Sequence, residues 1–542
     1  MRRLVIIILC ALAASHVSAG TQGKKFIQYG WGCPDTAYAR QHVQELEKAP
    51  FDGVVISVNG SKSGTGEDTL GWRVFSKVRT KPEDYKQAIA DLKATKFKRL
   101  TDNFIQVISM PGDVDWFDPE WSAIAHNAAC LARVAKQGGC KGIMFDPELY
   151  GSVWPWCYAR VPEKLRAART YEIYRAKVRQ RGREFIRAIN KEFPDITILT
   201  LFGPSLPYFP LRGNPEVKLD PTPYGLLAAF YDGILDAATP QTVLVDGYEF
   251  SYNYRRREEF EDGRRMMLSA KNISANPKEF DKHVRVGFGV WADFNSAAIP
   301  WNSDDFTKNY FTPAGLRASL NYALDVSDCY VWVYTERFLW WGGKPPAPPE
   351  YVETLRTAKL GPGPGEKNPL PSWIGQQKAS KMGGYSDDET FADMRKTMTE
   401  IYDMPKDDWR FAYDKPNNGA GKGWYREDFD DSRWTNVEIG KFWEEQVGIG
   451  VYDGRAWYRR SFTAPTVEPG KRVFLVFGAV DDAAKVWLNG RFLEERDAGW
   501  DKPFTVEVTR TLQPGEDNVM AVQVIDGTGY GGIWKSVKLM VR

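Results

Sequence analysis

Short apolar segments alternate with amphipathic helical segments from about residue 25 to residue 360, and this alternation constrains the fold more than any other feature. Eight segments have the length and residue types of buried strands: Phe26–Tyr29, Gly53–Val58, Phe104–Met110, Gly142–Asp146, Ile196–Phe202, Val243–Tyr248, Val284–Trp291 and Cys329–Glu336. Strands that alternate with helices form parallel sheets, and eight such units fit a (β/α)8 TIM-like barrel. A doubly wound sheet is the alternative, although its nucleotide-binding form needs a glycine-rich phosphate loop that this sequence lacks after its first strand.

The hydrophobic period changes to two from Trp409 onward. Segments such as RVFLVF, AKVWLNG and NVMAVQVID are separated by turn residues, which is typical of a β-sandwich. A Pro/Gly-rich stretch around Gly361–Pro371 precedes them, followed by a helical pattern near Glu389–Tyr402. We therefore expect a catalytic barrel over residues 24–360, a linker with a helix over residues 361–407 and an all-β sandwich over residues 408–542.

The N-terminal residues 1–19 have the pattern of a signal peptide. Arg2 and Arg3 precede the apolar run Leu4–Ala14, and Val17-Ser18-Ala19 offers small residues for cleavage. The run is too short to span a bilayer, and no other apolar run is long enough. We expect a secreted or periplasmic protein without a membrane span; its oligomeric state is left open.

Export would permit disulfides, and five cysteines remain after the signal segment. Cys130 could pair with Cys140, and Cys33 with Cys157, which would leave Cys329 as a free thiol. No CxxC spacing indicates zinc.

The amino-acid composition argues against several classes of catalysis and of binding partner. The chain has only four histidines, whereas zinc hydrolysis and Ser-His catalysis usually need histidine at the site. Lys plus Arg is 72 against 70 for Asp plus Glu, so no strong positive field favours a nucleic-acid partner. We expect carboxylate chemistry with no metal and no cofactor.

The segment KGIMFDPELYG, from Lys141 to Gly151, places two carboxylates where a hydrophobic strand stops. Because side chains alternate along a strand, Asp146 and Glu148 would share a side and point into the barrel mouth, where barrel enzymes carry their functional residues. Two carboxylates that close disfavour joint ionisation, so one could hold a proton near neutral pH. A glycosidase needs such a protonated acid and an ionised partner. A structural role for Asp146 as a helix cap is the alternative.

Three further strand ends carry acidic side chains. By the same alternation, Asp293, Glu336 and Asp246 would point to the mouth, and Glu249 would do so if Gly247 kinks its strand. We expect Glu148 to be the general acid and Asp146 to tune its pKa or act as a stabilising carboxylate. The other four, Asp293, Glu336, Asp246 and Glu249, compete for the role of nucleophile or base. A carboxyl separation of about 5 Å would favour retention of the anomeric configuration, and about 6.5–9.5 Å would favour inversion.

Aromatic residues crowd the same loops and make up 14% of the chain. Their rings offer apolar faces to the C–H faces of sugars. The pair in RFLWWGG and the pair around Pro155 are the strongest candidates for a sugar platform. The expected substrate-binding residues are Trp31, Tyr150, Trp154, Trp156, Tyr248, Trp291, Trp332, Tyr334, Trp340 and Trp341.

The C-terminal sequence carries a family resemblance. Its segments WTNVEIG, GRAWYRRSF, VWLNG and GGIWKSV resemble the jelly-roll sugar-binding domain of family 2 glycoside hydrolases over about 135 residues. The resemblance implies a galactose-binding-like jelly roll that either binds carbohydrate or braces a catalytic domain.

The barrel looks like that of a glycoside hydrolase of unassigned family. Its D-x-E at the fourth strand resembles the acid motif of family 18 chitinases, where Glu is the acid, and Tyr248 and Trp332 match a Tyr and a Trp of those families. The longer run of aspartates is replaced by Lys141-Gly142-Ile143-Met144. A fourth-strand Glu paired with a seventh-strand carboxylate would instead resemble the large retaining-glycosidase clan, but Pro147 and Asp293 stand where that clan has Asn and Glu.

These patterns predict a secreted glycoside hydrolase that cleaves a poly- or oligosaccharide by carboxylate catalysis. A carbohydrate-binding protein without catalysis is the second hypothesis. A polysaccharide lyase is the third, because the basic run NYRRREEF at Asn253–Phe260 follows the sixth strand, although this run also fits a helix surface.

Overall fold

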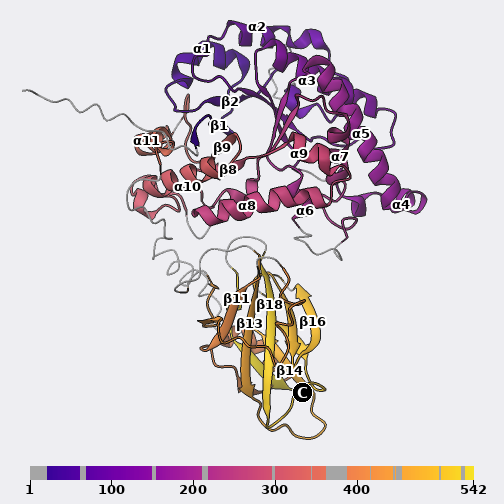
Figure 1. Ribbon diagram of the computed structural model, residues 1–542, viewed down its shortest axis with the longest axis vertical. Helices are drawn as coiled ribbons and strands as arrows, with labels where there is room; N and C mark the ends of the chain where they lie inside the picture. Colours follow the sequence, from indigo (N-terminus) through magenta and orange to yellow (C-terminus); the bar gives the residue numbers. More distant parts are fainter. Residues whose placement is uncertain are drawn as a thin grey trace, which may run out of the picture. The chain divides into compact units, whose positions relative to one another are not determined.

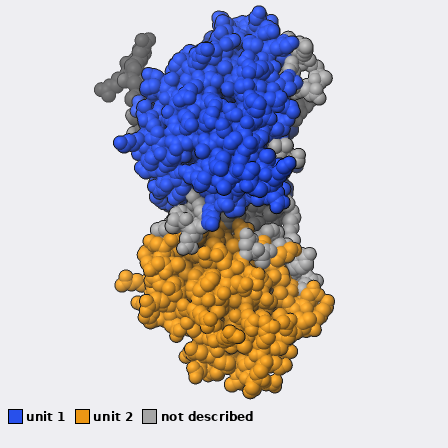
Figure 2. All heavy atoms as spheres, turned by 90° about the vertical axis from the view of Figure 1, so that its right-hand side faces the viewer, with its two compact units in different colours: residues 1–371 blue, residues 372–542 orange. Residues whose placement is uncertain are grey.

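The computed structural model describes residues 21–60, 69–148, 150, 154–209, 218–295, 300–343, 345–361, 387–414, 417–443, 446, 454–497, 499, 502–526 and 531–542. The expected signal peptide and almost all of the Pro/Gly-rich stretch lie outside these residues. Two compact units divide the chain, residues 1–371 and residues 372–542 (Figure 2).

The first unit is a closed parallel barrel. Its strands are β1 (Lys25–Gly30), β2 (Gly53–Ile56), β3 (Phe104–Ile108), β4 (Gly142–Asp146), β5 (Thr197–Thr200), β6 (Val243–Asp246), β7 (Val284–Val286), β8 (Phe288–Trp291) and β9 (Tyr330–Thr335). They pair in the order β7-β6-β5-β4-β3-β2-β1-β9-β8. Since Gly287 alone separates β7 from β8, these two segments fill one strand position and close the ring between β6 and β9. The predicted eight-unit barrel is confirmed, and the doubly wound sheet is excluded.

Helices surround the strands as an outer layer (Figure 1). The principal ones are α1 (Thr36–Leu46), α2 (Lys86–Ala94), α3 (Trp121–Gln137), α5 (Tyr171–Glu192), α7 (Leu227–Ala237), α8 (Arg257–Ser269), α10 (Pro313–Val326) and α11 (Pro349–Ala358). Shorter helices are α4 (Glu163–Ala168), α6 (Ser205–Tyr208) and α9 (Pro277–His283). Helix starts follow from local sequence: the carboxylate of Asp35 accepts from the amide of Tyr38, and Thr312 caps α10, with Pro313 as its first residue.

Side chains of β9 mark successive layers of the barrel interior. The Tyr330 hydroxyl donates to Asp102 Oδ1 (2.7 Å) near the start of the strand, Trp332 is fully buried two residues on, and Tyr334 reaches the pocket at the strand's end. Trp332 fits because the neighbouring strand has a glycine: a Cβ on Gly289 would lie 2.6 Å from the indole. A strand rises about 3.3 Å per residue, so residues on the same inward-facing side still differ greatly in depth.

The second unit is a β-sandwich. One sheet has the order β10-β19-β14-β17 and the other β12-β11-β13-β18-β15-β16, with antiparallel pairing. The strands are β10 (Thr399–Asp403), β11 (Trp409–Tyr413), β12 (Thr435–Val437), β13 (Gly454–Thr463), β14 (Val473–Phe477), β15 (Ala483–Leu488), β16 (Arg491–Asp497), β17 (Phe504–Glu507), β18 (Asp517–Asp526) and β19 (Val537–Val541). Both sheets contribute to one apolar core, for example through Tyr458 of β13 and Leu475 of β14.

The helix expected near Glu389–Tyr402 is shorter than predicted. Helix α13 covers Asp387–Arg395, and its Phe391 packs on Phe474, Val476 and Met540 of the four-stranded sheet. Thr399–Asp403 is instead strand β10, because it pairs with β19. This tertiary contact cannot be predicted from the local sequence pattern.

The expected disulfides are absent from the part of the chain that the structure describes. Cys33, Cys130, Cys140, Cys157 and Cys329 are all free thiols. Cys130 lies on α3 beside Thr80, and burial raises the pKa of its thiol. Among the described residues, no helix combines the length and hydropathy that crossing a bilayer would require.

Candidate active site

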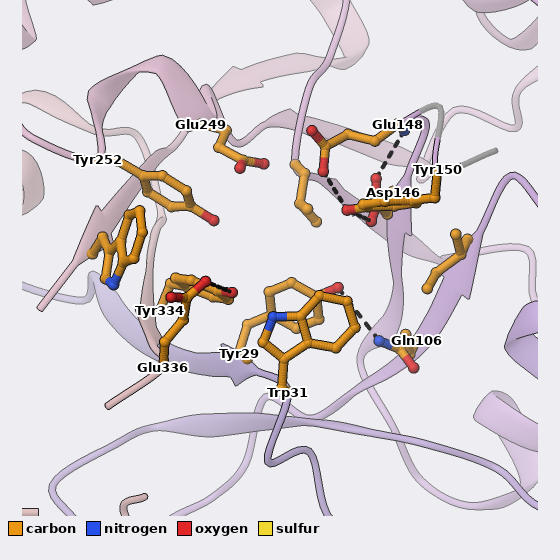
Figure 3. A pocket seen from close by; sticks show the side chains of 14 residues that line it. Tyr29, Trp31, Gln106, Asp146, Glu148, Tyr150, Glu249, Tyr252, Tyr334 and Glu336 are labelled. Carbon is orange, nitrogen blue, oxygen red and sulfur yellow. Dashed lines mark hydrogen bonds between the residues drawn. The ribbon is translucent and has the colours of Figure 1, made fainter. Parts of the chain in front are cut away.

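A pocket of about 220 Å³ opens where the barrel strands end at their carboxyl termini (Figure 3). It is smaller than the roughly 300–1000 Å³ of drug-sized ligand sites, so it fits a small ligand or one part of a larger one. Described residues that line it are Tyr29, Gly30, Trp31, Gln106, Ile108, Asp146, Glu148, Tyr150, Leu201, Glu249, Tyr252, Trp291, Tyr334 and Glu336. Asp146, Glu148 and Tyr150 lie on one side, and Tyr334 and Glu336 lie on the opposite side.

Asp146, Glu148 and Tyr150 form one hydrogen-bonded group. The amide of Glu148 donates to Asp146 Oδ1 (2.8 Å), and the Tyr150 hydroxyl lies 2.8 Å from Asp146 Oδ2 and also contacts Glu148 Oε2. A phenol carries one hydrogen and donates to one carboxylate, so the second contact requires a protonated carboxyl that donates to the phenol oxygen. The geometry thus fits one proton held by the two carboxyls.

The electrostatics of this group agree with a held proton. Burial, and then the charge of Glu148, raises the pKa of Asp146 to about 8. Burial also raises the pKa of Glu148, while the hydrogen bond with Tyr150 opposes that rise. A carboxyl that is still protonated near neutral pH is what general acid catalysis requires.

Glu249 reaches the pocket because the chain turns sharply after β6. Tyr248 takes a left-handed backbone conformation (φ 44°), and a 3-10 turn then begins at Glu249. The kink therefore falls one residue later than the glycine that the sequence suggested. Burial, followed by the charges of Glu148 and Asp146, raises the pKa of Glu249 well above its usual range.

Glu336 lines the opposite side and is held by its neighbours. The Tyr334 hydroxyl donates to Glu336 Oε1 (2.9 Å), and the amide of Glu336 donates to both oxygens of Asp293 (3.0 Å each). Asp293 is fully buried, also accepts from the indole of Trp291 (2.7 Å), and is not among the described residues that line the pocket. It fixes the loop that carries Glu336 rather than facing a ligand.

Asp246 and Tyr248 also lie away from the pocket. The buried Asp246 carboxylate accepts from the amides of Gly203 (3.1 Å) and Ser205 (2.9 Å), so it caps the turn after β5. Tyr248 is buried against Phe288 and Phe250, because its left-handed backbone turns the ring toward the helical layer instead of the barrel mouth.

Several expected sugar platforms are structural. Trp332 donates from its indole to the Gly247 carbonyl (2.8 Å) beneath the pocket, and Trp156 donates to the Pro147 carbonyl (2.9 Å) and so braces the Asp146–Glu148 turn. Three further tryptophans stand outside the lining: Trp154 under the guanidinium of Arg160, and Trp340 and Trp341 edge-on to Phe51. The two adjacent rings both reach Phe51 because their segment is not a strand and its side chains need not alternate.

Of the expected binding residues, Trp31 lines the pocket with 69% of its surface exposed, and Tyr150, Trp291 and Tyr334 also line the pocket. The lining also contains three residues that were not predicted from the sequence, namely Tyr29, Gln106 and Tyr252. Strand alternation could have found Tyr29, which shares a side with Trp31, and Gln106 near the end of β3. Tyr252 had no such signal, because it follows an irregular turn and stacks on Tyr334 (5.4 Å between ring centres).

The basic run at Asn253–Phe260 forms the start of α8 and its approach. The Arg255 guanidinium donates to the Tyr310 carbonyl, and Arg257 pairs with Glu261 (2.9 Å) and Asp325. This confirms that the run is a helix start rather than part of the pocket lining. Outside the pocket, Asp481, Asp482 and Asp526 of the second unit bring carboxylate oxygens within 4.8 Å of one another, a grouping that could hold a cation.

Comparison with known proteins identifies part of the second unit. Residues 444–529 match the family described as "Glycosyl hydrolase 2 galactose-binding domain-like". The chain carries a domain of that type at its C-terminal end. This galactose-binding-like domain agrees with the observed sandwich and with the family 2 resemblance of the sequence.

Individual relatives are similar over limited stretches. The chain is 28% identical over 134 residues to the β-glucuronidase of Formosa agariphila, covering 22% of this chain and 13% of that protein. It is 28% identical over 153 residues to the β-galactosidase of Thermoanaerobacter pseudethanolicus, covering 25% of this chain and 20% of that one. The solved Lactobacillus rhamnosus β-glucuronidase aligns at 21% identity over 26% of this chain and 29% of its own, with a TM-score of 0.24. The chain thus spans a fifth or less of the two curated relatives' lengths, so their activities describe those proteins.

Proposed function

We propose that this protein is a glycoside hydrolase whose barrel pocket cleaves a glycosidic bond with Glu148 as the general acid. The observation that carries the proposal is the hydrogen-bonded group of Asp146, Glu148 and Tyr150, whose contacts fit a shared proton, on one side of a pocket that has a further carboxylate on the opposite side. Glu148 lines the pocket, and burial raises its pKa. Its proton would go to the leaving oxygen as the bond to the anomeric carbon breaks.

We assign the ionised partner to Glu336. The hydroxyl of Tyr334 donates to its Oε1 and holds the carboxyl at the pocket wall opposite Glu148. In a retaining reaction Glu336 would attack the anomeric carbon, and in an inverting reaction it would take a proton from the attacking water. The exposed ring of Trp31 would cover the apolar face of a bound sugar.

Two other functions have less support. A lyase acting on acidic sugars needs cations near the uronate, and the pocket lining in the described chain contains neither lysine nor arginine. A carbohydrate-binding protein without catalysis has no need for a protonated carboxyl that faces a second carboxyl across the pocket, so this arrangement favours catalysis. The galactose-binding-like domain, together with the limited similarity to proteins named as a β-glucuronidase and a β-galactosidase, also favours a hydrolase acting on carbohydrate.

The test is the Glu148→Gln variant assayed on plant, algal and host glycans by release of reducing ends. The variant should lose at least about 100-fold in kcat while sugar binding persists. Glu336→Gln should lose activity to a similar degree, and NMR of the fresh product would then report retention or inversion. Unchanged hydrolysis by Glu148→Gln would reject the assignment, and failure of the wild-type protein to cleave any glycan would favour the binding function.

We further propose that the protein is exported. The charged Arg2-Arg3, the apolar run Leu4–Ala14 and the small residues before Gly20 support this. Expression of the full chain in a bacterial host, followed by N-terminal sequencing of the protein from the periplasm or medium, tests the proposal. A mature chain that begins near Gly20 is expected, and retention of Met1 inside the cell would contradict it.

A further inference from the structure

The described pocket lining contains acidic side chains but no basic ones. It contains the four carboxyls of Asp146, Glu148, Glu249 and Glu336, with no lysine or arginine among them. The nearest cation along the chain is Arg337, and its guanidinium turns to the side-chain oxygen of Asn295 instead. A bound ligand therefore meets negative or acidic groups on several sides.

Glu249 is the one carboxyl of the described lining to which the proposed hydrolysis assigns no role. Its Oε2 atom is buried without a hydrogen bond, and the hydroxyl of Tyr252 is the side-chain donor that opposes the rise in the pKa of this carboxyl. A buried carboxyl oxygen without a donor is costly, and a donor supplied by a ligand would remove that cost. The atom lies at the pocket wall, between the Glu148 side and the Tyr252 ring (Figure 3).

Resting on the hydrolase function proposed above, we propose that the pocket accepts a sugar unit that carries a free, protonated amino group, with the ammonium against Glu249. An ammonium supplies hydrogen-bond donors and a positive charge at once, and it offsets the repulsion among neighbouring carboxyls. A uronic acid would add a further negative charge to this pocket without a cation to pair it, and binding should fail. A neutral sugar would supply donors but would leave the repulsion in place.

Binding of an ammonium should also displace protons. Glu249 faces titratable groups on β1, on β4 and its loop, on its own turn and on β9, namely Tyr29, Asp146, Glu148, Tyr252 and Tyr334. Burial and the charges of Glu148 and Asp146 raise the pKa of Glu249 well above its usual range, which favours its protonated form in the free protein. A cation beside the carboxyl favours the ionised form, and that proton leaves as the amino sugar binds.

The experiment compares matched sugars by isothermal titration calorimetry at about pH 6, where an amine of this kind is protonated. The pairs are glucosamine with glucose and galactosamine with galactose, and glucuronic and galacturonic acids are the anionic members. In at least one pair the amino sugar should bind about tenfold more tightly than its neutral partner or better, and the acids should not bind. Repetition in buffers of different ionisation enthalpy should show proton release for the amino sugar alone.

Equal affinity within both pairs, or binding of a uronic acid, would overturn the proposal. Glu249→Gln should abolish the preference for the amino sugar and its proton release, whereas Glu258→Gln, an exposed carboxyl at the start of α8, should leave both unchanged. Binding is measured without turnover, so an amino-sugar preference in a protein that cleaves no glycan would reject the hydrolase function and keep this inference. Hydrolysis of glycans by a protein that shows no preference for amino sugars would support the hydrolase function and reject this inference.

Discussion

The phenol hydroxyl of Tyr150 lies 2.8 Å from Oδ2 of Asp146, although the ring of Tyr150 is largely outside the barrel core. The same hydroxyl contacts Glu148, so one surface residue joins the two acids that end β4. This arrangement fits a single proton held between a buried and an accessible carboxyl, and the hydrogen bonds of Tyr150 oppose the rise in their pKa values.

Tyr150→Phe should move the pH dependence of activity upward. The hydroxyl can donate to either acid, and this hydrogen bond opposes the rise in the pKa of the acid that accepts it, so loss of the hydroxyl raises the pKa values of the group. The alkaline limb of the pH profile of kcat/KM, which reports the general acid, should therefore shift to higher pH, with kcat lower by about tenfold or more. Tyr158→Phe, which removes a hydroxyl bonded to the Arg169 carbonyl, is the control and should leave the profile in place. An unshifted profile for Tyr150→Phe would remove it from the proton-holding group.

Asp293→Asn should destabilise the loop that carries Glu336. Asp293 accepts from the amides of Glu336, Arg337 and Phe338, and an amide side chain keeps only one of its two acceptor oxygens. The free energy of unfolding should fall by about 1–3 kcal/mol at neutral pH, as measured by urea denaturation. Asp304→Asn, at an exposed carboxyl, is the matched control. Equal stability of the two variants would contradict the anchoring role.

The pH dependence of stability gives Asp293 a second signature. Burial raises the pKa of Asp293 to about 6, whereas its ordinary value is 3.8. The folded state then binds a proton more tightly than the unfolded state, so this residue's contribution falls as pH rises from about 4 to about 6 and is constant above that range. Denaturation curves across these pH values should show a smaller decline for Asp293→Asn than for the wild-type protein. An identical decline in both would argue against a raised pKa at this position.

Trp31→Ala should weaken substrate binding without changing stability. The ring is 69% exposed, so its loss removes little packing, but it removes an apolar face at the pocket mouth. KM should rise by about tenfold with kcat nearly unchanged, and the melting temperature should stay constant. Trp72→Ala, at an exposed ring outside the described pocket lining, should leave KM unaltered. A loss confined to kcat would place Trp31 in transition-state contact instead.

Gly289→Ala should disturb the pocket from below. The new methyl group would lie 2.6 Å from the indole of Trp332, which cannot move without losing its bond to the Gly247 carbonyl. Overpacking of this kind costs about 1–3 kcal/mol of unfolding free energy. Combining it with Trp332→Phe should recover part of that loss, because the smaller ring makes room, and a double-mutant cycle measures the coupling. Strict additivity would show that the two side chains do not compete for space.

Sequence periodicity alone was enough to predict the barrel and the sandwich. Alternating strand and helix patterns leave few ways to bury every apolar face, and a closed parallel barrel is one of them. The same period of two placed Asp146 and Glu148 at the mouth, because inward and outward positions on a strand follow directly from residue number. Tyr29 and Gln106 were accessible to the same rule.

Only the tertiary structure shows how deep an inward-facing side chain lies, how the chain turns after a strand, and which groups hydrogen-bond to a buried carboxylate. Trp332 points inward as its position requires, yet the stagger of neighbouring strands leaves it beneath the pocket instead of inside it. Glu249 faces the ligand side because Tyr248 adopts a left-handed conformation that propensity does not foretell in a tyrosine. Asp293 and Asp246 resemble catalytic acids in sequence, but backbone amides from distant segments occupy their oxygens. Sequence order fixes which side of a strand a residue takes, whereas only the packed chain decides which groups meet there, since those contacts join segments far apart along the chain.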